Sequence, residues 1–136
     1  MKVLLIDDEQ PIIDFYCHAA KSRGYADIDT VTSAEEALTQ VLRQDYSLII
    51  LDINMPGASG LEIVSMLRNL CPHAVIAVIS GHIPKEVPGE VAECTDVMIS
   101  KPIHTDTFGQ LLEWAAEISE VLDKIHHLEK GNVAVE

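Results

Sequence analysis

Short apolar runs that alternate with stretches of helical periodicity limit most strongly how this chain can fold. Three segments are continuous apolar runs rich in isoleucine, leucine and valine, and they are Val3–Ile6, Leu48–Leu51 and residues 74–79. Runs of this kind are typical of parallel strands that are buried on both faces of a sheet. Ile28–Val31 and residues 97–99 are weaker candidates for strands. The pattern therefore predicts a sheet of short, mostly buried strands.

Between these runs, apolar residues recur three and four positions apart, which places them on one face of a helix. The pattern is clearest in residues 12–20, 34–41 and 63–70. Ser33 followed by Glu36 is a capping-box arrangement that begins the second of these helices. Gly24 and Pro72 stand where the first and the third should end. Strands that alternate with helices imply right-handed βαβ crossovers and a doubly wound α/β sheet.

The functional crevice of such a sheet lies beyond the carboxyl ends of its strands. Asp7 and Asp8 follow the first predicted strand, and Asp52 follows the third. Ser80 follows the fourth strand and Lys101 the fifth. We therefore expect these carboxylates, the hydroxyl and the ammonium group to meet at one rim of the sheet.

Carboxylates that crowd together repel one another, and burial makes their charge still more costly. A hard divalent cation such as Mg²⁺ relieves this repulsion, because it prefers oxygen ligands from carboxylates, water and phosphate. A carboxylate beside such an ion can attack a phosphoryl group as a nucleophile. Lys101 and Ser80 could then stabilise the phosphoryl oxygens. The rim thus favours phosphoryl chemistry supported by magnesium.

Composition narrows the class of protein. The chain has 136 residues, which suits one domain, and a formal net charge of −13, which would repel nucleic acid. Its three cysteines are odd in number and show no CxxC spacing, so we expect reduced thiols. The first apolar run meets three acids at once, unlike a signal peptide, and no run reaches the roughly 18 residues of a membrane span. We expect a cytoplasmic protein without direct nucleic-acid or membrane binding.

The rim residues also form blocks that resemble a known family. These blocks are Asp7-Asp8-Glu9, residues 52–57 with Gly60-Leu61-Glu62, Ser80, and Lys101-Pro102. In this order, each at a strand end, they resemble the response-regulator receiver domain of two-component signalling over about residues 1–120. The resemblance implies a flavodoxin-like, five-stranded parallel sheet in the order 2-1-3-4-5 with helices on both faces. It also implies a receiver domain over residues 1–121, followed by a helix extension and tail over residues 122–136.

The resemblance assigns a role to each matching position. Asp52 would be the phosphoacceptor, and Lys101 and Ser80 would contact the phosphoryl group. Asp7, Asp8, Asp52 and the backbone carbonyl of Asn54 would hold Mg²⁺. A sensor histidine kinase or a phosphotransfer protein would be the donor, and phosphorylation would switch an output surface. Such a module catalyses only its own phosphotransfer and dephosphorylation, so it is not an enzyme with a separate substrate.

Two features near the fifth strand depart from the family pattern. Met98 stands where the family usually has an aromatic residue that moves with phosphorylation. Met98 is therefore either a softer element of the switch or an ordinary core residue. Pro84 and the pair Pro88-Gly89 interrupt the region of the fourth helix. We expect this helix to be short, delayed or irregular.

The last helix is longer than a receiver domain needs. Apolar residues repeat at four-three spacing through Leu111, Ala115, Ile118, Leu122 and Ile125, and the periodicity continues to Leu128 before Gly131-Asn132. We expect one helix over residues 105–130, based on the sheet through Phe108, Leu111 and Leu112. Its end is either a simple overhang, a linker to an absent output domain, or a stalk that joins two copies of the chain.

Two other functions remain open. One is a phosphohydrolase with an aspartyl-phosphate intermediate. Enzymes that resemble haloacid dehalogenases carry the nucleophile in an acid-x-acid motif after the first strand, which Asp7-x-Glu9 matches poorly, and the chain has no room for their cap domain. The other is an interaction module that is never phosphorylated, although every residue of the expected pocket is present. The sequence does not identify the kinase, the stimulus, the output or the phosphoryl lifetime.

Overall fold

The computed structural model describes residues 1–57 and 60–128, and in this part of the chain a parallel sheet forms the centre. Its strands are β1 Val3–Ile6, β2 Ile28–Val31, β3 Leu48–Leu51, β4 Val75–Ser80 and β5 Val97–Ser100. They pair in parallel in the order β2-β1-β3-β4-β5. The expected flavodoxin-like order is confirmed, and both weak strand candidates are real strands.

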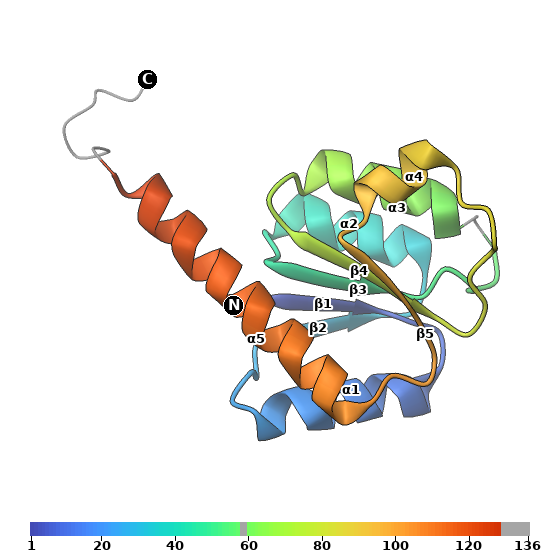
Figure 1. Ribbon diagram of the computed structural model, residues 1–136, viewed down its shortest axis with the longest axis horizontal. Coiled ribbons are helices and arrows are strands. Elements are labelled where there is room, and N and C mark those ends of the chain that lie inside the picture. The colour runs from blue at the N-terminus through green and yellow to red at the C-terminus, as the bar shows by residue number, and fades with distance from the viewer. Residues whose placement is uncertain (58–59, 129–136) are drawn as a thin grey trace.

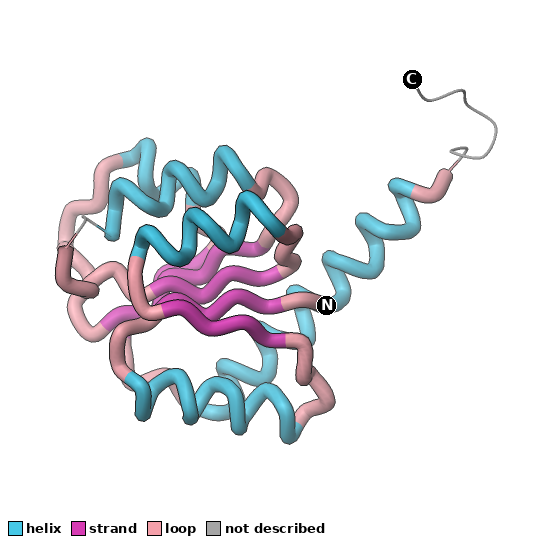
Figure 2. Tube along the Cα trace, turned by 180° about the vertical axis from the view of Figure 1, so that it is seen from behind, coloured by secondary structure: helices cyan, strands magenta, loops and turns pink. Residues whose placement is uncertain are grey.

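Helices cover both faces of the sheet (Figures 1 and 2). They are α1 Gln10–Ser22, α2 Ala34–Arg43, α3 Gly60–Leu70, α4 Gly89–Cys94 and α5 Thr105–His126. One apolar cluster joins the sheet to α2 and α3, with α4 at its edge, and a second joins the opposite face to α1 and α5. Alternate residues of each strand supply the two clusters, as Leu4 and Leu5 show. This explains why the central strands are apolar throughout.

Local signals set the ends of the helices much as expected. The Ser33 hydroxyl accepts a hydrogen bond from the Glu36 amide at 3.2 Å, so the N-cap of α2 is formed. The Glu36 carboxylate accepts from the Thr32 amide at 2.9 Å, one residue earlier than in a standard capping box. α1 ends at Ser22, before Gly24 with its φ of +92°. α3 ends at Leu70, before Pro72.

The fourth helix is short, as the prolines predict. α4 has six residues and begins directly after Pro88, which lies outside the helix as its N-cap. Arg68 of α3 contacts the C-terminal end of α4. Its Nε donates to the Cys94 carbonyl at 3.0 Å, and its guanidinium pairs with Asp96 at 2.7 Å. The end of α4 that leads into β5 is thus fixed to α3.

α5 runs from the sheet out of the body of the domain (Figure 1). The helix ends at His126, so the expectation of a helix to residue 130 is too long by its last residues, and the expected stop at Gly131-Asn132 lies outside the described part. Phe108 and Leu112 are buried against the sheet, and Leu111 is half-buried. Among the described residues, no helix is long and apolar enough to cross a membrane.

The exposed apolar stripe of α5 differs from the one that the spacing suggested. Ala115 is buried, and Leu122 is half-buried in a cavity wall with Ser47. The residues that face outward are 47–70 % exposed, and they are Trp114, Ile118, Val121, Ile125 and, just beyond the last helical residue, Leu128. They also follow four-three spacing. Ile118 and Ile125 belong to both stripes, whereas Trp114 and Val121 take the places of Ala115 and Leu122. The sequence could not separate the two stripes, because the docking angle of α5 decides between them.

Gly60, the first residue of α3, leaves no room for a side chain. An added Cβ would overlap both the Cα and the carbonyl oxygen of Ile53. Because this neighbour is backbone, we expect Gly60→Ala to lower the free energy of unfolding by about 1–3 kcal/mol. Gly89→Ala is the matched control, since a Cβ on this first residue of α4 meets nothing within 4 Å. Urea denaturation measures both, and equal stability of the two variants would contradict the packing.

Candidate functional site

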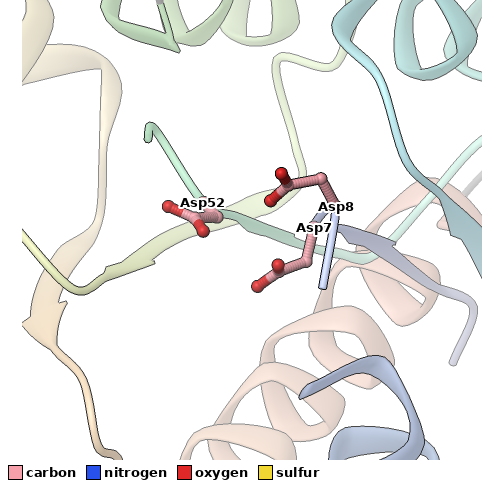
Figure 3. Close-up of side chains that lie close together, drawn as sticks. All are labelled: Asp7, Asp8 and Asp52. Atoms are coloured by element: carbon pink, nitrogen blue, oxygen red, sulfur yellow. The ribbon is translucent and has the colours of Figure 1, made fainter. Parts of the chain in front are cut away.

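The ends of β1 and β3 bring three carboxylates together (Figure 3). Asp7, Asp8 and Asp52 each offer one carboxylate oxygen, and these oxygens all lie within 4.8 Å of one another. Asp7 and Asp52 are buried, with 2 % and 5 % of their surface exposed, whereas Asp8 is open to solvent. Such an arrangement concentrates negative charge at one point of the rim, and its oxygen donors suit a hard divalent cation.

Lys101 enters this cluster from the end of β5. Its Nζ lies 2.9 Å from Oδ2 of Asp7 and 3.0 Å from Oδ2 of Asp52, so one ammonium group bridges two strand ends. Burial alone would lower the pKa of Lys101, but the hydrogen bonds and charges of Asp7 and Asp52 outweigh it and raise the pKa. Lys101 is therefore charged, and it compensates the two buried carboxylates.

The Asp52 carboxylate is held on both oxygens. Oδ1 accepts hydrogen bonds from the Ser80 hydroxyl at 2.8 Å and from the backbone N–H of Asn54 at 2.9 Å. Oδ2 accepts from Lys101. Burial raises the pKa of Asp52, but the donors Asn54, Lys101 and Ser80 together outweigh burial and hold the pKa below its ordinary value. The carboxylate is thus ionised and oriented, as a nucleophile must be.

Asn54 connects this site to a second loop. Its side-chain amide donates to the backbone carbonyl of His82 at 3.0 Å, and His82 lies in the loop between β4 and α4. The sequence assigned Asn54 only a backbone carbonyl role, so this link was missed. Its geometry depends on how two loops approach each other, which no local pattern in the sequence reveals.

Tyr16 is a second residue that sequence reasoning left in the core. It is buried beneath the rim, and its ring stacks on Phe108 with centroids 4.9 Å apart. The pKa of Tyr16 is raised to about 12. Burial is the largest cause, Lys101 lowers the pKa, and the carboxylates of Asp7 and Asp52 raise it. Tyr16 and Lys101 also line a cavity of about 260 Å³ with Ile12. The phenol therefore stays neutral beside the charged cluster.

The structure brings together every side chain that was predicted for the site. The ends of β1, β3, β4 and β5 carry the expected residues, which are Asp7, Asp8, Asp52, Ser80 and Lys101. For Asn54 the expected group was the backbone carbonyl, whereas the contact that the structure shows is its backbone N–H, which donates to Asp52. Met98 lies on β5 opposite Val78, half-buried against the α2–α3 cluster. Met98 thus packs against the core without being fully buried, and its role in a switch stays untested.

Sequence comparisons agree with this geometry. A family model described as the response regulator receiver domain matches residues 3–113. The chain is 34% identical over 113 residues to the transcriptional regulatory protein HprR of Escherichia coli, covering 82% of this chain and 48% of HprR. It is 29% identical to the transcriptional regulatory protein YvrH of Bacillus subtilis, covering 91% of this chain and 50% of YvrH. The chain thus spans about half the length of these curated relatives.

Solved structures are similar over most of the chain. The response regulator TrrA of Thermotoga maritima, solved with Mg²⁺ and BeF, has a TM-score of 0.75 and 30% identity, and the match covers 85% of this chain and 99% of TrrA. A receiver domain protein of Methanospirillum hungatei has a TM-score of 0.79 at 22% identity, covering 88% and 96% of the two chains, and supports the fold alone. A response regulator of Burkholderia pseudomallei that carries a phosphorylated aspartic acid has a TM-score of 0.73 and 25% identity, covering 95% and 74%.

Asp8 is the carboxylate of the cluster that Lys101 does not compensate. Among the described residues, the ion pairs of Lys101 reach Asp7, Asp52 and the more distant Glu9, but not Asp8. We expect Asp8→Ala to raise the free energy of unfolding without divalent ions by up to roughly 1 kcal/mol, because a repulsive charge is removed. Asp45→Ala, which removes an exposed carboxylate far from the rim, should have a smaller effect. Urea denaturation in EDTA measures this, and a less stable Asp8→Ala variant would contradict the repulsion.

Proposed function

The chain belongs to the response regulator receiver domain family, and we propose that it is a signalling module whose Asp52 accepts a phosphoryl group. One observation supports this choice of acceptor above all. Asp52 is the carboxylate that contacts both Lys101 and Ser80, at 3.0 Å and 2.8 Å. These are donors of the kind that stabilise phosphoryl oxygens during transfer.

The proposed transfer uses groups that are already in place. An oxygen of the ionised Asp52 attacks the phosphorus of a phosphohistidine, a new P–O bond forms, and the P–N bond to the donor breaks. The electron pair of that bond leaves with the donor imidazole, which takes up a proton. Lys101 and Ser80 then turn their hydrogen bonds from Asp52 to the oxygens of the transferred group. Release occurs when the oxygen of a water molecule attacks the same phosphorus and the P–O bond to Asp52 breaks, which returns the Asp52 carboxylate and yields inorganic phosphate and a proton.

The residues at the rim fit Mg²⁺. The three clustered carboxylate oxygens are hard ligands, and Asp8 is open to water, which Mg²⁺ retains in most of its sites. We propose that Asp7, Asp8, Asp52 and the backbone carbonyl of Asn54 hold the ion. When bound, it supplies positive charge for the phosphoryl oxygens. Lys101 keeps the two buried carboxylates compensated before the ion arrives.

The proposal includes the biological setting. The donor is a sensor histidine kinase or a phosphotransfer protein, and the module acts in the cytoplasm without direct contact with nucleic acid. It catalyses only its own phosphotransfer and dephosphorylation. We propose that the receiver domain extends over residues 1–121, with residues 122–136 as extension and tail. The family match to residues 3–113 lies within the first range, and residues 129–136 lie outside the part that the structure describes.

Mass spectrometry tests the acceptor. Incubation with acetyl phosphate and Mg²⁺ should add one phosphoryl group to the wild type and none to Asp52→Asn, because the amide is not a nucleophile. Asp45→Asn is the matched control and should be labelled like the wild type. Full labelling of Asp52→Asn would rule out the assignment. Continuous release of phosphate without a stable label would instead favour a phosphohydrolase, and no label at all an interaction module.

The last helix offers a surface for a second copy of the chain. Its exposed stripe, the five outward-facing residues from Trp114 to Leu128, has the four-three spacing with which like helices pair. The stripe continues into an apolar cavity of about 520 Å³, lined by Val97, Ile99 and Leu111, which enlarges the area available for contact. Glu117 and Lys124 lie seven residues apart along one side of the stripe, and Lys124 pairs with Glu120 of the same helix at 3.6 Å. In an antiparallel pair of copies, Lys124 would exchange this exposed partner for Glu117 of the other copy. A homodimer through α5 is therefore part of the proposal.

Sedimentation tests the dimer. We expect Val121→Glu with Ile125→Glu to weaken association at least tenfold, because burying each apolar side chain contributes about 1.5–3 kcal/mol. Val121 is substituted rather than Leu122, because Leu122 is half-buried and lines a cavity with Ser47. Gln44→Glu with Asn69→Glu adds the same charge at exposed sites elsewhere and is the control. A monomeric wild type at high micromolar concentration would contradict the dimer and leave an overhang or a linker.

A further inference from the structure

Two histidines meet at the end of the domain opposite to the acidic rim. His73 lies in the connection between α3 and β4, and His126 is the last residue of α5. Figure 1 shows α5 passing the ends at which the strands begin, on its way out of the body. The two ring centroids are 5.6 Å apart, and the ring planes are inclined by 62°. Segments far apart in the sequence thus bring two imidazoles side by side.

The surroundings of the pair hold further ligand atoms. A cavity of about 110 Å³ is lined by both histidines and by Asp123, which precedes His126 by one helical turn. A second cavity of about 210 Å³ is lined by both histidines and by Asp45. The hydroxyls of Ser47 and Ser119 lie 3.0 Å apart and hold α5 against this edge of the domain. The position of His126 beside His73 is therefore supported by a second contact.

We propose that His73 and His126 bind a divalent transition-metal ion such as Zn²⁺, which fastens the end of α5 to the α3–β4 connection. Zinc binds imidazole nitrogen at about 2.0–2.1 Å, which puts each ring centroid roughly 3.2 Å from the metal. Two imidazoles on one tetrahedral ion then have centroids roughly 5–6 Å apart. The observed separation of 5.6 Å lies in this range, so the rings need to turn but not to approach.

Asp123 is the third ligand that the helix offers. Residues three positions apart share a helical face, so Asp123 and His126 can reach one ion together. Among the described residues, the acidic rim is the one group of three whose donor atoms already lie within 4.8 Å. The donor atoms of His73, His126 and Asp123 are not yet this close. The side chain of Asp123 would have to change its rotamer to reach the ion, and water would fill any remaining coordination position.

The two ends of the domain would select different ions. Carboxylate oxygens at the rim suit Mg²⁺, whereas imidazole nitrogens suit Zn²⁺, Cu²⁺ and Ni²⁺. An ion at the histidine pair joins α5 to the body just before Leu128, the last residue of the exposed stripe. It would thereby fix the direction in which the stripe leaves the domain. This inference does not depend on phosphorylation of Asp52.

Calorimetric titration with Zn²⁺, in excess Mg²⁺ to occupy the rim, tests the site. We expect one site per chain in the wild type and a loss of affinity of at least about tenfold in His73→Ala and in His126→Ala, because each removes a ligand. His127→Ala is the matched control: its ring Nδ1 lies 2.6 Å from the Asp123 carbonyl, outside the pair. Asp123→Asn should weaken binding by a smaller factor. All of these side chains are exposed, so the variants should fold.

Hydrogen exchange provides a second readout. Zn²⁺ should slow amide exchange in residues 119–126 of the wild type and of His127→Ala, but not of His126→Ala. Equal Zn²⁺ affinity in the wild type and His126→Ala would overturn the proposal. So would an equal loss of affinity in His127→Ala, because the effect would then not be specific to the pair.

Discussion

The arrangement of the rim depends on the ion pairs that Lys101 makes with Asp7 and Asp52. These pairs join the ends of β1, β3 and β5, which are brought to one edge by the parallel topology. Two buried carboxylates without a partner would be costly, and breaking a buried pair typically costs several kcal/mol. The charge that makes the site reactive is thus also a constraint on the fold. A divalent ion or a phosphoryl group at the rim must change this balance of charge.

Two hydrogen bonds connect the surroundings of Asp52 to a loop at the surface, and a change of charge at Asp52 would act on both. Ser80 holds Oδ1 of Asp52 from the end of β4, and Asn54 joins the neighbouring loop to the carbonyl of His82. Both hydrogen bonds lead into the loop between β4 and α4. Arg68 fixes the far end of α4 to α3, so movement would be concentrated in this loop and the first turn of α4. We propose that these contacts carry the response of the domain, in which an aromatic residue at position 98 would not be required.

The sequence predicts the rim well, because strand ends can be located from apolar runs and the topology places them at one edge. Asp7, Asp8, Asp52, Ser80 and Lys101 were all found in this way. The bond from Asn54 to His82 and the place of Tyr16 beneath Lys101 were not, since they depend on loop approach and packing. The outward face of α5 also escaped prediction. Two heptad stripes were possible, and the docking angle of the helix buried Ala115 and half-buried Leu122.

A crystal structure with Mg²⁺ and beryllofluoride tests the central claim most directly, because beryllofluoride mimics a phosphoryl group on a carboxylate. The account predicts beryllium bonded to an Asp52 oxygen and Mg²⁺ among Asp7, Asp8 and Asp52. Lys101 and the Ser80 hydroxyl should then leave Asp52 and bind fluorine atoms. Metal bound elsewhere, with Lys101 still 3.0 Å from Asp52 and no beryllium attached, would contradict it.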